Sequence, residues 1–282
     1  MVVQQHGHPG DSAKISARRA AAAVAVASLV AGVSGCGGGA EAGDRNADPT
    51  QAVREAPDRL VREGSSQART SMEMASGGTR VTVKGEGAYD YREGIGELKV
   101  QLPKDAAGAQ EHRPITELLA PGALFMKNRG SGVPADKWVR VDTASLTDGN
   151  LVTGGATDPL AAAELLRGAR QVTYVGQSEV EGVRTRHYRG SVDLTAAAKA
   201  ASAGNKGALA AAAKGFGKEP VAFDVYLDDD GLIRKLRHRF AFANGQQKKE
   251  VASTTLLYGF GKPVRVRLPD KKDIFAGKVA EE

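Results

Sequence analysis

The stretch that decides the fold runs from Val221 to Phe240 and reads VAFDVYLDDDGLIRKLRHRF. In its first half, apolar residues recur at every second position, which is the period of a half-buried strand. Asp230-Gly231 follows, a dipeptide that favours a tight hairpin turn. Beyond the turn, Leu236 and Phe240 continue the apolar face, and basic residues occupy positions between them. The stretch therefore predicts an antiparallel hairpin with one face in the core and the other in solvent.

The same alternation extends over most of the chain and predicts about ten strands, mostly in sequential hairpins. A long hairpin is expected over residues 172–194, with Glu181-Gly182 as its turn. The other expected strands cover residues 68–74, a segment that begins at 81–83, and residues 97–102, 115–119, 123–128, 138–141, 251–257 and 264–268.

Three helices are expected, at residues 51–63, 159–168 and 195–214. Pro57 predicts that the first helix is broken or starts late. Asp158 is a favoured N-cap ahead of a first-turn proline, so it marks the start of the second helix. Gly204 and Gly207 predict breaks in the third. Because the helices are grouped and do not alternate with strands, the fold class is α+β with a large antiparallel sheet, in one domain over residues 51–282.

The N-terminal residues 1–35 have the three parts of a secretory signal. A basic segment precedes the apolar run of residues 20–33, and small residues lead to Cys36, the only cysteine of the chain. Val33-Ser34-Gly35-Cys36 resembles the lipobox that lipoprotein signal peptidase cuts; an ordinary signal with an incidental cysteine is the alternative. The apolar run is too short to span a bilayer stably.

Lipidation of Cys36 with diacylglycerol would anchor the mature protein to the extracytoplasmic side of the cell membrane. The anchor would be stable, because it has two acyl chains. Residues 36–50 are rich in Gly and Ala and form the expected flexible tether. Three of the 39 basic and one of the 33 acidic side chains lie in residues 1–35, so the mature chain carries a net charge of +4. That charge suits an anionic membrane surface and is too weak and too evenly spread to indicate nucleic-acid binding.

The absence of known catalytic and metal-binding motifs favours a binding protein over an enzyme. The sequence has no HExxH, no nucleophile elbow and no P-loop, and lipidation of Cys36 would leave no cysteine for a disulfide or a metal site. His112, His187 and His238 are each interpreted as satisfied or solvent-facing. The acidic run 228–230 is interpreted as a hairpin turn, because its contiguous acids do not match a calcium loop. No enzyme activity, metal or cofactor is expected.

A basic cluster lies on the return strand of the deciding hairpin and comprises Arg234, Lys235, Arg237, His238 and Arg239. Two interpretations remain open. The favoured one is the solvated face of an antiparallel strand. The other is contact with a lipid headgroup or another polyanion.

The order of several short motifs resembles the LppX/LprAFG-type cell-envelope lipoproteins, which share the fold of the periplasmic carrier LolA. The motifs are Gly-x-Gly-x-Tyr-Asp (85–90), Lys-Trp-Val-Arg-Val-Asp (137–142), Asp158-Pro159 with its helix, Thr-Arg-His-Tyr (185–188), Val-Tyr-Leu-Asp-Asp-Asp-Gly (225–231) and Tyr-Gly-Phe-Gly-Lys-Pro-Val (258–264). The resemblance implies a strongly curved antiparallel sheet, a half barrel, whose concave face is covered by helices. It also implies an apolar cavity for the acyl chains of a lipid or lipoglycan, and no catalytic residues.

The expected function is therefore a non-enzymatic lipid or lipoglycan carrier, with an envelope sensor or protein-interaction module of unknown partner as the alternative. Residues on alternating strand faces are the candidates for the cavity wall, and each could also be plain core. They are Met72, Met74, Leu98, Val100, Phe125, Trp138, Phe223, Val225, Leu236 and Phe240.

Overall fold

The computed structural model describes residues 48–76, 79–103, 113–130, 132–152, 157–244 and 247–277. The predicted signal, Cys36, most of the predicted tether and His112 lie outside these ranges. Eleven strands form one sheet in the described part: β1 (Ser65–Ser76), β2 (Thr79–Asp90), β3 (Ile95–Gln101), β4 (Ile115–Ala120), β5 (Ala123–Lys127), β6 (Val139–Asp142), β7 (Ala169–Val180), β8 (Val183–Val192), β9 (Val221–Leu227), β10 (Ile233–Asn244) and β11 (Gln247–Tyr258).

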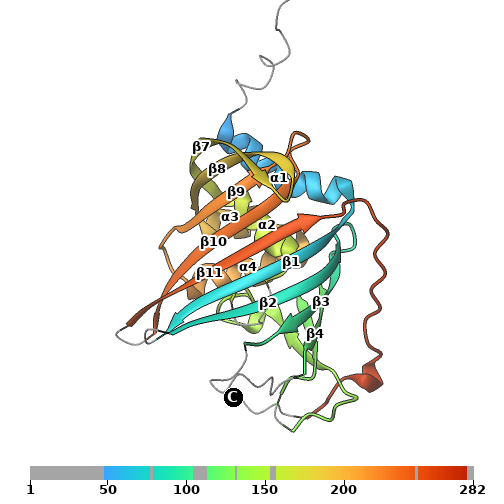
Figure 1. Ribbon diagram of the computed structural model, residues 1–282. Helices are drawn as coiled ribbons and strands as arrows, with labels where there is room; N and C mark the ends of the chain where they lie inside the picture. The colour runs from blue at the N-terminus through green and yellow to red at the C-terminus, as the bar shows by residue number, and fades with distance from the viewer. Residues whose placement is uncertain are drawn as a thin grey trace, which may run out of the picture. The chain divides into compact units, whose positions relative to one another are not determined.

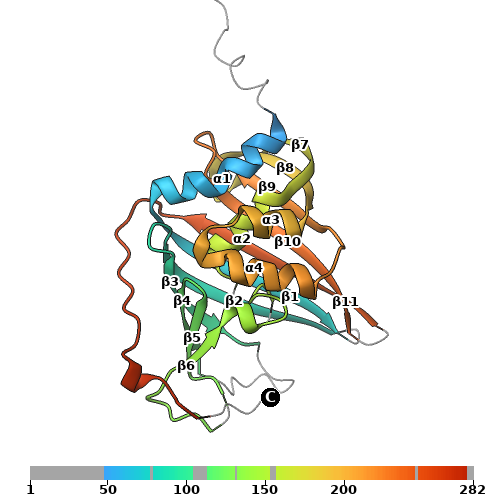
Figure 2. The same cartoon turned by 180° about the vertical axis from the view of Figure 1, so that it is seen from behind.

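The sheet is antiparallel throughout and open at both edges. Its strand order is β6-β5-β4-β3-β2-β1-β11-β10-β9-β8-β7 (Figures 1 and 2). Neighbours in the sheet are neighbours in the chain, except that β1 pairs with β11 and so joins an N-terminal meander to a C-terminal one. The predicted α+β fold with a large antiparallel sheet is confirmed.

One predicted strand is wrong. Residues 264–268 form no strand; the segment from 262 to 270 is irregular and runs along the side of the sheet (Figure 1). Pro263 and Pro269 flank it and have no N–H to donate to a sheet ladder, which explains why it does not pair. The chain that follows this segment reaches the residue just before β6, where the backbone N–H of Trp138 donates to the carbonyl of Asp273 at 2.8 Å.

The helices α1 (Pro49–Glu63), α2 (Pro159–Leu165), α3 (Leu194–Ala200) and α4 (Ala203–Gly215) cover one face of the sheet, with the 3-10 turns η1 (Thr143–Ser145) and η2 (Leu166–Gly168) beside them (Figure 2). We call this covered face the inner face and the opposite one the outer face. A further 3-10 turn, η3 (Lys271–Asp273), lies near the C-terminus. Of the helices in the described ranges, none is both long and apolar enough to cross a membrane.

The predicted break at Pro57 is wrong, because α1 continues through it. Val53, Ala56 and Leu60 are fully buried on the same face, and Arg54 donates from Nε and Nη2 to the carbonyl of Ala169 at 3.0 and 2.7 Å. These tertiary contacts outweigh the roughly 3 kcal/mol that an interior proline costs a helix. The helix also begins earlier than predicted, since Asp48 caps it and Pro49 occupies its first turn.

The third predicted helix breaks at a different place. The chain interrupts it at Ala201-Ser202, and α4 then runs through Gly204 and Gly207 without a break. The buried carboxylate of Glu164 accepts hydrogen bonds from both the backbone N–H and the hydroxyl of Ser202. A tertiary contact therefore fixes the break, and glycine propensity does not.

The described residues form two apolar clusters. The larger one lies between the inner face and the helices and includes side chains from each of the strands β1–β11 and from α1–α4. The smaller one lies on the outer face and joins Leu118 and Phe125 to the C-terminal residues Val266 and Ile274. The C-terminal segment thus covers apolar side chains that would otherwise face solvent.

Candidate functional site

The interior between the inner face and the helices is the candidate site, and eight of the ten predicted cavity residues lie there. Met74 packs against the larger cluster, and seven others belong to it: Met72, Leu98, Val100, Phe223, Val225, Leu236 and Phe240. Phe125 and Trp138 lie apart from them, in the smaller cluster on the outer face. The eight inner residues come from β1, β3, β9 and β10, so the candidate wall spans the centre of the sheet.

Helix α4 covers this wall with mostly small side chains. Leu209 of α4 is fully buried, and the neighbouring Ala208 and Ala212 of the same helix are buried too. At the C-terminal end of α4, the ring of Phe216 stacks on Phe240 with centroids 5.0 Å apart. A fully buried leucine contributes about 1.5–3 kcal/mol. Leu209 and the ring of Phe216 are therefore the large apolar side chains that hold α4 against the wall.

One side of α4 packs closely against the segment that follows β6. A Cβ at Gly149 would collide with the carbonyl of Ala208, and one at Gly215 would collide with the carbonyl of Thr147. Gly149 also has φ +60°, which side chains rarely adopt. These two glycines let helix and segment backbones touch.

A buried polar contact ties α4 to α2. Glu164 is 1% exposed and accepts from Asn205 Nδ2 at 3.0 Å as well as from Ser202. Arg167 lies 3.6 Å from the same carboxylate and pairs with Asp58 of α1 at 2.7 Å. This chain of contacts links the start of α4 to α1 through α2.

A second polar chain reaches the inner face at the start of α2. Asp158 caps the helix by accepting from the backbone N–H groups of Leu160 and Ala161, and Tyr89 donates to it at 3.1 Å. Tyr91 packs beside Tyr89 with centroids 5.1 Å apart. Burial raises the pKa of Asp158 to about 6, even though these hydrogen bonds stabilise its charged form.

His238 differs from its predicted environment. It is 1% exposed, lies between Phe223 and Phe240, and its Nε2 has no hydrogen-bond partner in the described part of the chain. The interpretation of this histidine as satisfied or solvent-facing was wrong. Its phase in β10, shared with Leu236 and Phe240, was the signal in the sequence that places it inside. Burial lowers the pKa of His238 to about 3, so the ring is neutral at physiological pH.

The acidic turn at residues 228–230 is structural, as predicted. Asp228 accepts from the backbone N–H groups of Asp230 and Leu232 and from Arg234 Nε, and Asp229 pairs with Arg184 at 2.7 Å. Across the ranges that the structure describes, no group of three or more His, Cys, Asp or Glu residues could hold a metal ion.

No protein-family model and no curated protein matches the chain. Among solved structures, the lipoprotein LppX of Mycobacterium tuberculosis aligns with TM-score 0.48 and 11% identity over 78% of this chain and 98% of that one. LprF from Mycobacterium bovis aligns with TM-score 0.40 and 12% identity over 78% and 96%. A LolA superfamily protein from Nitrosomonas europaea also aligns, with TM-score 0.34 and 10% identity over 80% and 97%. At these identities the likeness concerns the fold alone.

Proposed function

We propose that the chain is a membrane-anchored, non-enzymatic envelope protein that binds the acyl chain of a lipid or lipoglycan between the inner face and the helices. The observation that carries the proposal is the combination of a largely apolar wall, which also holds the buried polar side chains of Thr70, His238, Ser253 and Thr255, with a cover of small side chains. Removal of an acyl chain from water contributes about 25 cal/mol per Å² of apolar surface, and this gain would offset the displacement of a helix that places two large apolar side chains, Leu209 and Phe216, in the interior.

Helix α4 is the element whose movement would admit the ligand. Its large buried side chains are Leu209 at its centre and Phe216 at its end, and its polar anchor is the contact of Asn205 with Glu164. Opening of α4 leaves the strand pairing intact, because no strand ladder includes it.

The anchor is proposed on the sequence of residues 1–36. Diacylglycerol on Cys36 would hold the domain at the extracytoplasmic face of the cell membrane, where lipid ligands are available. The folded part would lie close to the membrane, because only 11 residues lie between Cys36 and Asp48 and a segment of that length spans at most about 40 Å.

A disulfide that holds α4 closed tests the proposal. A Cβ at Gly207 would lie 3.2 Å from the Cβ of Ala144, slightly less than the roughly 3.5–4.5 Å of a disulfide. Ala144 lies two residues beyond β6 and is held there, since its N–H donates to Asp142. The double substitution Ala144→Cys/Gly207→Cys is made in the full chain with Cys36→Ser, so that no third thiol interferes and the protein is free of acyl anchor.

Uptake of a fluorescent fatty-acyl probe is then measured before and after reduction. The reduced protein is expected to take up the probe and the oxidised one to exclude it, while Ala144→Cys alone behaves the same in both states. Mass spectrometry of lipid extracted from the protein provides a second reading. Absence of both probe uptake and extractable lipid would contradict the carrier and favour the protein-interaction module.

A further inference from the structure

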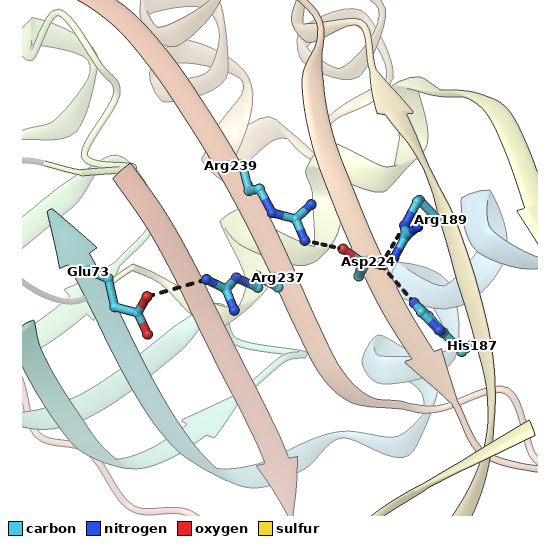
Figure 3. A network of polar contacts seen from close by, with 6 residues as sticks. All are labelled: Glu73, His187, Arg189, Asp224, Arg237 and Arg239. Carbon is cyan, nitrogen blue, oxygen red and sulfur yellow. Dashed lines mark hydrogen bonds and ion pairs between the residues drawn. The ribbon is translucent and has the colours of Figure 1, made fainter. Parts of the chain in front are cut away.

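The outer face carries a cluster of cations arranged around one buried carboxylate. Asp224 of β9 is 4% exposed although it points away from the helices. It accepts hydrogen bonds from His187 Nε2 at 2.8 Å, Arg189 Nε at 2.9 Å and Arg239 Nη2 at 2.6 Å. Figure 3 shows these side chains converging on Asp224 from the two strands that flank β9.

Asp224 fixes the two arginines and stays charged while it does so. Burial alone would raise the pKa of Asp224, but the hydrogen bonds from Arg239, His187 and Arg189 outweigh burial and hold the pKa below its ordinary value. Arg189 is oriented through Nε and Arg239 through one terminal nitrogen. Because a guanidinium has five N–H donors, each arginine retains donors that Asp224 does not use.

Those donors face solvent. The side chains of Arg189 and Arg239 are 60% and 46% exposed, whereas that of Asp224 is 6% exposed. The neighbouring Arg237 pairs with Glu73 at 3.3 Å, and Lys235 lies over the ring of Tyr226. The three arginines and Lys235 outnumber the two carboxylates, Asp224 and Glu73, so these six side chains have a surplus of two positive charges.

A pocket of about 170 Å³ adjoins the cluster and is lined by Arg237 and Arg239 together with Arg80, Glu73 and Glu250. The two glutamates oppose binding of an anion deep in this pocket. An anion is therefore best accommodated at its Arg239 side, toward Arg189, where Asp224 is already neutralised.

We propose that Arg189 and Arg239, held by Asp224, form a binding site for a phosphate group. A phosphate oxygen pair matches the planar fork of a guanidinium, and two arginines fixed in advance lose little conformational freedom on binding. The phosphate can be free in solution or can belong to an anionic lipid headgroup. The site lies on the opposite face from the proposed acyl site and does not depend on it.

The test uses the full-length lipidated protein in phosphatidylcholine nanodiscs. Phenylglyoxal modifies accessible arginines, and mass spectrometry of peptides gives the rate at each position. Arg170 is the internal control, because its side chain is also 60% exposed and pairs with one carboxylate, Asp193, at 2.6 Å. One arm adds inorganic phosphate against chloride of equal ionic strength, and the other replaces part of the lipid with phosphatidylglycerol.

Modification of Arg189 and Arg239 is expected to slow at least about tenfold at saturating ligand, because only the unoccupied fraction reacts. Protection by phosphate and by phosphatidylglycerol would indicate a site open to both sources, and protection by the lipid alone would assign the headgroup. Equal protection of Arg170, equal protection by chloride, or no protection in either arm would overturn the proposal.

Variants provide an independent reading. Arg189→Gln and Arg239→Gln are each expected to weaken phosphate binding about tenfold or more, through loss of charge-assisted hydrogen bonds. Arg170→Gln is expected to leave the affinity unchanged. If a glutamine variant does not fold, Arg189→Lys keeps the charge without the fork and should still lose affinity; unchanged affinity in all folded variants would contradict the proposal.

Discussion

Substitution of Asp158, the half-buried N-cap of α2, should make the protein more stable at neutral pH. Asp158 has a pKa of about 6 in the folded protein against an ordinary value of 3.8. Between these values the folded state binds more protons than the unfolded state, so the contribution of Asp158 to stability falls as pH rises through this window. Each pH unit corresponds to 1.36 kcal/mol, which sets the cost of ionisation at neutral pH at about 3 kcal/mol or less.

Asp158→Asn removes the charge and keeps a favoured N-cap that can accept from Leu160 and Ala161. Urea unfolding of wild type and variant at pH values from 4 to 7 gives the difference in free energy of unfolding. We expect this difference to shift in favour of the variant by about 1–3 kcal/mol between pH 4 and pH 7. The matched control is Asp48→Asn, which changes the same Asp-Pro cap at an exposed site of α1. A difference that stays constant from pH 4 to pH 7 would refute the reasoning.

Three further predictions follow from the anchor, the inner wall and the outer cluster. Cys36→Ala should abolish incorporation of labelled palmitate and leave the protein soluble or unprocessed; unchanged labelling would exclude the anchor. Val225 is fully buried in β9 and tests the wall. If it lines ligand space, Val225→Trp should lower acyl-probe uptake and change the melting temperature little; a loss of about 1–3 kcal/mol or more in the free energy of unfolding identifies Val225 as plain core. Asp224→Ala should destabilise by about 1–3 kcal/mol, because it leaves Arg189, Arg239 and His187 around a missing carboxylate; a melting temperature equal to that of wild type would contradict the role assigned to Asp224.

Most of the strands could be predicted because each shows its buried face in its own sequence. β10 is the clearest case, with Leu236 and Phe240 inside and Arg237 and Arg239 outside. The alternation fails where both faces are covered. In β5, Leu124 and Phe125 are both buried, one toward the helices and one beneath the C-terminal segment, so the sequence could not assign Phe125 to a face.

The errors in the helices come from tertiary contacts that local propensity does not contain. Pro57 is tolerated because α1 buries a full apolar face, and the break between α3 and α4 is set by Glu164, which lies 38 residues before Ser202. The start of α1 at Asp48-Pro49 is predictable from the sequence, because the same dipeptide, Asp158-Pro159, marks the start of α2.

The polar sites were harder to predict because their members come from different strands. Asp224 stands between two apolar residues of the deciding hairpin, and nothing in that hairpin shows that Arg189 of β8 lies across from it. Register alone brings them together, and register depends on the pairing of the whole sheet. The basic run of β10 and Asp224 are both visible in the sequence, but the pairing of Asp224 with Arg189 and Arg239 is not.

The two proposed sites share strands and yet should act independently. Arg239 and Phe240 are adjacent in β10, but their side chains point to opposite faces of the sheet: Arg239 pairs with Asp224, whereas the ring of Phe240 packs against Phe216 and His238. Substitutions at sites without shared partners usually add in free energy. Arg239→Gln combined with the Ala144→Cys/Gly207→Cys lock should therefore lose phosphate protection and acyl uptake each to the same extent as the separate variants. A lock that also changed phosphate affinity would mean that movement of α4 displaces the backbone of β10, and the sheet would then transmit ligand binding from its inner face to its outer face.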